Sequence, residues 1–245
     1  AYGKGHLKAK ISALFHRFLE WKLGKESVSY LTDSELLAQL QWKTFKREIF
    51  VLPIPHTKEI QKRGKGKERL MWWPGGSLRE DKGLSTIRRM IPSLGKMRLV
   101  VAEMGQSLLP PSPQLLFVPT LLSEKDYTEW MERVDCVILP YDPIDYAHRT
   151  SGIFVEAVAA GVIPFVSRGS WMGYELEKFG LERLTFSWEE PWEEQELEER
   201  FLTLLEDREI EARFRAMSGA YRTFHSKEGF GEAIGKLWER RASSP

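Results

Sequence analysis

The chain has 245 residues, 42% apolar and 29% charged, a composition that excludes a disordered protein and allows one large domain or a domain with an appendage. Its single cysteine, Cys136, excludes an internal disulfide and a cysteine metal cluster, and suits a reducing cytoplasm. No apolar run approaches the roughly 18 to 20 residues that span a bilayer. Net charge is +1, but residues 1–100 hold 21 Lys and Arg against 9 Asp and Glu. This basic front favours an anionic partner, such as a phosphate ligand, a membrane surface or nucleic acid, or is an ordinary solvated surface.

The first predicted element is a helix over residues 5–23, where apolar side chains recur at helical spacing and basic side chains supply the other face. Such a helix either packs its apolar face on a core or lies on anionic lipid, and both interpretations stay open. The apolar positions are Leu7, Ile11, Leu14, Phe15, Phe18 and Leu19.

A strand is predicted next at residues 28–32, followed by a helix through Leu40 that is capped by Asp33 or Ser34. A second strand follows at residues 49–55 and is ended by prolines. These elements form a strand, helix and strand ahead of the main body of the chain.

A basic loop with glycines, residues 61–69, is interpreted either as a solvated hairpin or as a phosphate contact. It precedes a predicted strand at residues 70–74, a glycine-rich turn over residues 75–84, and a helix through Met90. The turn has neither the Walker spacing nor the dinucleotide-binding fingerprint, because its glycines do not fall at the required offsets.

Short, β-branched apolar runs in the rest of the body are typical of strands buried on both faces of a parallel sheet. A helix over residues 124–133, with Ser123 and Asp126 spaced as a capping box, precedes the third of them, and a helix ended by Gly161 precedes the fourth. This alternation predicts an α/β fold whose ligands lie outside the carboxyl ends of the strands. The strands are predicted at residues 97–102, 115–119, 134–140 and 162–166.

The main candidate site lies between the last two of these strands, where Thr150, Ser151 and Gly152 begin a helix. Free N–H groups and the positive end of the helix dipole attract phosphate there, and Gly152 would allow close approach to the backbone. Ser151 is equally explained as an ordinary N-cap. Glu156, one turn into the helix, is interpreted as an acceptor for ribose hydroxyls or as a solvated side chain.

The carboxy-terminal part is predicted to be helical. An acidic run at residues 188–199 holds seven Glu and is expected to begin a solvated helix through Leu205. Residues 229–240 form a helix whose apolar face should dock on the body, and residues 242–245 are expected to be a disordered tail. The apolar face comprises Phe230, Ala233, Ile234, Leu237 and Trp238.

The run EAVAAGVIPFV at residues 156–166 follows an Asp-x-x-x-x-Pro strand, and together they resemble the signature of the carboxy-terminal domain of GT-B glycosyltransferases, in particular the glycosyltransferase 4-like, retaining group. The resemblance implies a Rossmann-like parallel sheet with helices on both faces, the carboxy-terminal half of a GT-B fold. It implies that residues 1–60 are a remnant of the amino-terminal acceptor domain with the interdomain segment, residues 61–225 the nucleotide-sugar donor domain, and residues 226–245 a terminal helix and tail. Most of the acceptor domain would then be absent from this chain.

The same resemblance implies a set of site residues. Lys82 matches the family lysine that neutralises the departing diphosphate; the family arginine falls on Ser77, so Arg79 is its expected substitute. His148 stands where the family carries a first Glu, eight residues before the ribose-binding Glu that Glu156 matches. The catalytic candidates are therefore Lys82, Arg79 and His148, and the donor-binding candidates are Gly76, Ser77, Pro119, Thr120, Arg149, Thr150, Ser151, Gly152, Ile153 and Glu156.

The implied function is transfer of a hexose, with retention, from a UDP or GDP sugar to an unknown acceptor. No metal or cofactor is expected, since no Asp-x-Asp or His cluster suggests one. A cytoplasmic enzyme is expected, and peripheral membrane contact through the first helix stays open as the alternative to packing on a core. Nucleic acid is not expected as a partner, because the basic half lacks interleaved aromatics and a known motif. The alternative is a noncatalytic Rossmann-like interaction module, favoured by the departures from the family pattern at His148 and Glu103.

Overall fold

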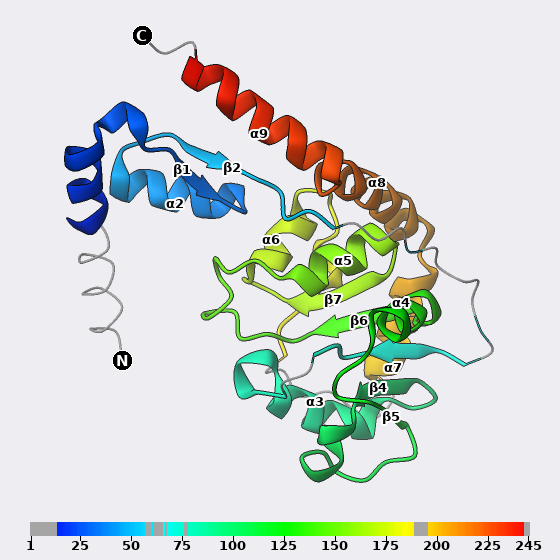
Figure 1. The fold of residues 1–245 in the computed structure, drawn as a ribbon. Helices are drawn as coiled ribbons and strands as arrows, with labels where there is room; N and C mark the ends of the chain where they lie inside the picture. The colour runs from blue at the N-terminus through cyan, green and yellow to red at the C-terminus, as the bar shows by residue number, and fades with distance from the viewer. Residues whose placement is uncertain are drawn as a thin grey trace. The chain divides into compact units, whose positions relative to one another are not determined.

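A computed structural model describes residues 14–56, 60, 66, 68–75, 78–188 and 196–242 of the chain. It divides into two compact units, Ala1–Pro55 with Phe224–Pro245 (unit 1) and His56–Thr223 (unit 2), each drawn in Figure 1.

Unit 1 contains a small parallel β-α-β arrangement. Strand β1 (Tyr30–Thr32) pairs with β2 (Ile49–Val51), and helix α2 (Glu35–Phe45) connects them. Ser34 caps α2 by accepting a hydrogen bond from the N–H of Leu37 at 3.2 Å, which decides between the two predicted caps. The helix runs five residues beyond Leu40, because no helix-breaking residue occurs before Lys46 takes a left-handed conformation.

Two further helices belong to unit 1. The described part of the first covers residues 14–23, and α9 (Lys227–Ala242) is the last element of the chain. A single 3-10 turn, Lys25–Ser27, precedes β1. The predicted apolar face of the last helix is only partly correct: Leu237 is buried, but Trp238 is 71% exposed. Of the predicted tail, residues 243–245 lie outside the described part of the chain.

Unit 2 is built on a six-stranded, fully parallel sheet in the order β5-β4-β3-β6-β7-β8. The strand order reverses between β3 and β6: the chain continues from β3 to β4 on one side and from β6 to β7 on the other. Such switch points hold ligands in open α/β sheets. The Rossmann-like fold predicted from the sequence is confirmed. The strands are β3 (Leu70–Trp72), β4 (Arg98–Ala102), β5 (Leu115–Val118), β6 (Cys136–Leu139), β7 (Ile163–Ser167) and β8 (Thr185–Phe186).

The connecting helices lie on the two faces of this sheet, as right-handed crossovers between parallel strands would place them. Helices α4 and α5 contact each other on one side, while α7 contacts the turn after α3 on the other (Figure 1). The helices are α3 (Leu84–Met90), α4 (Glu124–Arg133), α5 (Gly152–Ala160), α6 (Trp171–Glu177), α7 (Glu196–Glu206) and α8 (Arg208–Phe224), with 3-10 turns at Glu80–Lys82, Ile91–Ser93, Glu103–Ser107 and Glu182–Leu184.

The core lies between sheet and helices. The predicted strands after residue 133 are buried throughout, and Phe165 of β7 packs on Phe201 of α7 with ring centroids 4.5 Å apart. The prediction of a purely solvated acidic helix was therefore wrong for α7: Leu197, Phe201 and Leu204 follow helical spacing and are buried. The earlier part of that acidic run, residues 189–195, and most of the loop at residues 61–69 lie outside the described residues.

Candidate functional site

The turn after β3 and the loop after β6 meet at the switch point of the sheet. Gly83 has φ 88°, and a Cβ placed there would lie 2.3 Å from the carbonyl oxygen of Pro140. The N–H of Asp142 donates to the carbonyl of Asp81 at 3.0 Å, and the indole N–H of Trp73 donates to the carbonyl of Lys82 at 3.2 Å. A glycine is therefore required for the close approach that brings Lys82 to the end of β6.

Three cations gather at this junction. The Lys82 ammonium lies 5.7 Å from the centroid of the Tyr141 ring, and the Arg149 guanidinium lies 4.6 Å from that of Tyr146. Burial lowers the pKa of Lys82, and the charges of Arg79 and Arg149 lower it further, against an opposing effect of Asp81. The three positive charges repel one another, and an anion bound among them would relieve this repulsion. An anion is therefore stabilised at this junction.

Arg79 differs from the other two cations because it is already paired. Its Nε and Nη2 donate to the two carboxylate oxygens of Asp81 at 2.9 and 2.8 Å. The pKa of Arg79 is raised by this pairing. Asp81 thus offsets the positive charge of Arg79 at the point where the sequence predicts a contact with a leaving group.

The start of α5 lies beside the cations. Ser151 caps the helix by accepting from the N–H of Phe154 at 3.3 Å, so the N-cap interpretation is confirmed. Gly152 is exposed, and nothing lies within 4 Å of a Cβ placed on it, which leaves room at the first turn, where N–H groups have no partner within the helix. Burial raises the pKa of Tyr141, whose hydroxyl interacts with the Ser151 side chain, so this phenol stays protonated beside the helix start.

Glu156 has partners that the sequence did not indicate. The Tyr127 hydroxyl on α4 donates to Oε2 of Glu156 at 2.5 Å, and Nδ1 of His56 lies 3.4 Å from Oε1. The ring of Tyr127 packs on Trp72, with centroids 5.2 Å apart. Glu156 is therefore more than a solvated helical side chain. No spacing links Tyr127 or His56 to Glu156, so the sequence held no signal for this contact.

The other predicted residues are distributed along the same edge of the sheet. Pro119 and Thr120 follow β5, two strands from β3, and the N–H of Thr120 donates to Oε1 of Glu103 at 3.4 Å. His148 is exposed on the loop after β6. Thr150 and Ile153 flank the α5 start at intermediate exposure, whereas Gly76 and Ser77 lie outside the described residues.

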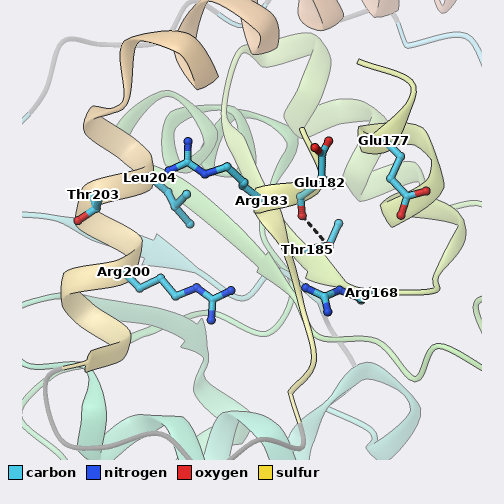
Figure 2. Close-up of a pocket in the computed structure, with 8 residues that line it drawn as sticks. All are labelled: Arg168, Glu177, Glu182, Arg183, Thr185, Arg200, Thr203 and Leu204. Atoms are coloured by element: carbon cyan, nitrogen blue, oxygen red, sulfur yellow. Dashed lines mark hydrogen bonds between the residues drawn. The ribbon is translucent and has the colours of Figure 1, made fainter. Parts of the chain in front are cut away.

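A cavity of about 460 Å³ lies elsewhere, beside the edge strand β8 (Figure 2). Its charges largely compensate: it has three arginines and two glutamates, and Arg183 is paired with Asp207 at 2.6 Å. The guanidinium of Arg200 lies 4.4 Å from the centroid of the Phe186 ring. None of the predicted site residues that the structure describes is among those that line this cavity, which are Arg168, Glu177, Glu182, Arg183, Thr185, Arg200, Thr203 and Leu204.

Among the described residues, no group of three or more His, Cys, Asp or Glu is placed to hold a metal ion. No helix in this part of the chain is long and apolar enough to cross a membrane.

Comparison with known proteins gives a result only at the level of structure, since no family model and no curated protein matches the sequence. Sucrose-phosphate synthase from Thermosynechococcus elongatus superposes with a TM-score of 0.62 at 14% identity, covering 87% of this chain and 58% of that one. The chain has the fold of GT-B glycosyltransferases. The GtfA/B complex shares this GT-B fold with a TM-score of 0.63 at 10% identity, over 92% of this chain and 48% of that one. Anabaena HepE, solved in complex with UDP-glucose, gives 0.59 at 12% identity, over 86% and 64%. The chain thus spans about half to two thirds of the length of these GT-B structures.

Proposed function

We propose that this protein binds a nucleotide-diphosphate sugar at the switch point of unit 2 and transfers the hexose to an acceptor, with retention at the anomeric carbon. The observation that carries the proposal is the convergence of Lys82, Arg149 and the amino terminus of α5 on one point of the sheet edge. A structural neighbour, Anabaena HepE, was solved with UDP-glucose, which fits a donor of this class.

Transfer requires heterolysis of the bond between the anomeric carbon and the diphosphate. Negative charge builds on the leaving oxygens, so fixed positive groups that face them supply most of the stabilisation. Lys82, Arg149 and the N–H groups at Gly152 and Ile153 perform this role, whereas the contribution of Arg79 is reduced by its pair with Asp81. The proposal includes no resident metal or cofactor, because these fixed cations and N–H groups can supply the charge stabilisation that a divalent metal would otherwise provide.

The other predicted residues are assigned to the rest of the donor. Glu156 accepts hydrogen bonds from the ribose, Pro119 and Thr120 flank the nucleobase, and His148 donates to a sugar hydroxyl where the resembling family uses a carboxylate. We propose that the enzyme is cytoplasmic and that the nucleotide of its donor is UDP or GDP. The acceptor is not specified by any of these groups.

Calorimetric titration with UDP and GDP tests donor binding. One of the two should saturate the protein, and Lys82→Ala should weaken it by about tenfold or more, as expected for the loss of a charge-assisted contact. Lys125→Ala is the matched control, because Lys125 is exposed on α4 and pairs along its own helix with Glu129. Absence of saturable binding by either nucleotide would contradict the proposal.

The acceptor side is proposed to be incomplete, because the chain spans only 48% to 64% of the length of the GT-B structures above. Residues 1–60 are interpreted as a remnant of an acceptor domain. We therefore expect donor binding without efficient transfer by this chain alone. Turnover at the rate of an ordinary two-domain transferase would refute that expectation.

A noncatalytic interaction module is the second candidate. It is favoured by His148 in place of a carboxylate and by the neutralisation of Arg79 by Asp81. Binding of UDP or GDP by this chain, with neither transfer nor hydrolysis of the UDP- and GDP-sugars tested even when acceptors are supplied, would favour it.

Peripheral membrane contact is proposed for unit 1. Phe15 and Phe18, which the sequence placed on an apolar face, are at least half exposed in the described helix at residues 14–23. Trp21, which is not part of that predicted face, is 79% exposed. Arg17 and Lys22 lie exposed beside them, the combination that interfacial helices use on anionic lipid.

Co-sedimentation with phosphatidylserine-containing vesicles, compared with pure phosphatidylcholine, tests this contact. Trp21→Ala with Phe18→Ala should abolish sedimentation, whereas Trp238→Ala, which alters an equally exposed Trp on α9, should not. Equal behaviour of the two variants would argue against the helix as the contact.

A further inference from the structure

Three segments that are far apart in the sequence converge on the carboxylate of Glu156. His56 is the first residue of unit 2, Tyr127 lies on α4, and Glu156 lies on α5. The Tyr127 hydroxyl is 2.5 Å from Oε2, and His56 Nδ1 is 3.4 Å from Oε1. Each carboxylate oxygen is thus met by a different side chain.

Tyr127 is well suited to hold the carboxylate. Its ring packs on Trp72, which is 2% exposed on β3, so the hydroxyl is fixed by the sheet. Burial raises the pKa of Tyr127, and the negative charge of Glu156 raises it further, so the phenol remains a hydrogen-bond donor throughout the physiological range. A short bond between a fixed phenol and a carboxylate strongly restricts the carboxylate rotamer.

The Glu156 carboxylate is fixed by its partners and yet remains accessible to solvent. The Glu156 side chain keeps 31% of its surface exposed. A carboxylate offers about four lone-pair sites, so bonds to Tyr127 and His56 are compatible with a bond from a ribose hydroxyl. A glutamate side chain without such partners would instead lose rotamer freedom on binding a ligand, and this loss of entropy would lower its affinity.

We propose that Tyr127 and His56 are positioning residues that hold Glu156 ready for the 2′- and 3′-hydroxyls of ribose, and so set discrimination between ribonucleotides and deoxyribonucleotides. This inference rests on the proposed nucleotide-sugar function. Tyr127 and His56 do not contact the ligand themselves in this arrangement; both act through Glu156.

The test measures dissociation constants for the preferred nucleoside diphosphate and for its 2′,3′-dideoxy form by calorimetry, using the full chain. In the unaltered protein the dideoxy form should bind about tenfold or more weakly, as expected for hydrogen bonds to a charged group. Glu156→Gln should remove most of that ratio. Tyr127→Phe should lower the ratio about three- to tenfold, the effect expected for freeing one rotamer-rich side chain. His56→Gln should lower it in the same direction.

Tyr174→Phe is the matched control, because Tyr174 lies on α6 and its ring contacts Lys178 rather than Glu156. Circular dichroism at the titration temperature establishes that each variant is folded, and His56→Gln provides a second variant if Tyr127→Phe is not. An unchanged ratio in both folded variants, or equal weakening of both ligands, would overturn the inference while leaving the proposed function intact. Absence of binding to either nucleotide by the unaltered protein would instead overturn the proposed function and the inference with it.

Discussion

Replacement of Gly83 by alanine should destabilise unit 2 and weaken donor binding together. The residue has φ 88°, and the new Cβ would lie 2.3 Å from the carbonyl oxygen of Pro140. The left-handed conformation costs about 1 to 2 kcal/mol, and displacement of packed backbone adds about 1 to 3 kcal/mol. The expected loss in free energy of unfolding is therefore about 2 to 5 kcal/mol.

Gly161→Ala provides the comparison that separates these two causes. Gly161 also has a left-handed conformation, with φ 77°, but its nearest neighbour is the hydroxyl of Ser218 at 4.0 Å. Strain alone should cost about 1 to 2 kcal/mol there. Any gain from stiffening the unfolded chain is shared by both variants and cancels in the difference.

Urea denaturation followed by circular dichroism measures both losses, and titration with UDP or GDP measures the effect on the Lys82 turn. Gly83→Ala should lose at least about 1 kcal/mol more than Gly161→Ala, and only Gly83→Ala should weaken nucleotide binding. Equal losses in the two variants, or normal binding by Gly83→Ala, would refute the role assigned to the close approach at Pro140.

Three other predictions concern charges. The pKa of Lys82 in the folded protein lies below its ordinary 10.5, so between these two pKa values the unfolded chain binds more protons than the folded protein. The free energy of unfolding should therefore rise with pH across that range, while nucleotide affinity falls as the ammonium loses its proton. An affinity that stays constant in alkali would contradict a direct role for this ammonium. The Asp135 carboxylate accepts hydrogen bonds from the N–H of Leu70 at 2.8 Å and from the Arg69 guanidinium at 3.2 Å, so Asp135→Ala should lower the free energy of unfolding by about 2 to 3 kcal/mol in urea denaturation. A loss below about 1 kcal/mol would show that this carboxylate does not stabilise the pairing of β3 with β6. Asp81→Asn should release Arg79 and tighten UDP or GDP several-fold in calorimetry, and weaker binding would show that Asp81 serves mainly to shape the turn.

The sequence predicted the sheet well because buried parallel strands carry their signal locally. Residues 134–140 and 162–166 are short apolar runs bounded by polar or glycine residues, and both are strands of the sheet. The Ser123 cap and the Gly161 stop are equally local, since each depends on a hydrogen bond or dihedral angle within one turn. The boundaries of α4 were therefore predicted to the residue.

The site was predictable only in part, because its groups meet through the fold. The position of Lys82 follows from the turn in which it lies, but its neighbours Arg149 and Tyr141 come from the loop after β6, about 60 residues or more later in the sequence. The contacts of Glu156 with Tyr127 and His56 join residues separated by 29 positions or more, and no periodicity reports such a pair. The pairing of Arg79 with Asp81 is local, yet two adjacent opposite charges in a loop are too common to predict a bidentate contact.

The central claim is that the α5 start and Lys82 bind a diphosphate rather than any nucleotide. Calorimetric comparison of UDP with UMP, and of GDP with GMP, tests it most directly. We predict that the preferred diphosphate binds about tenfold or more tightly than its monophosphate, and that this advantage disappears in Lys82→Ala. Equal affinities for the diphosphate and the monophosphate in the unaltered protein would contradict the claim.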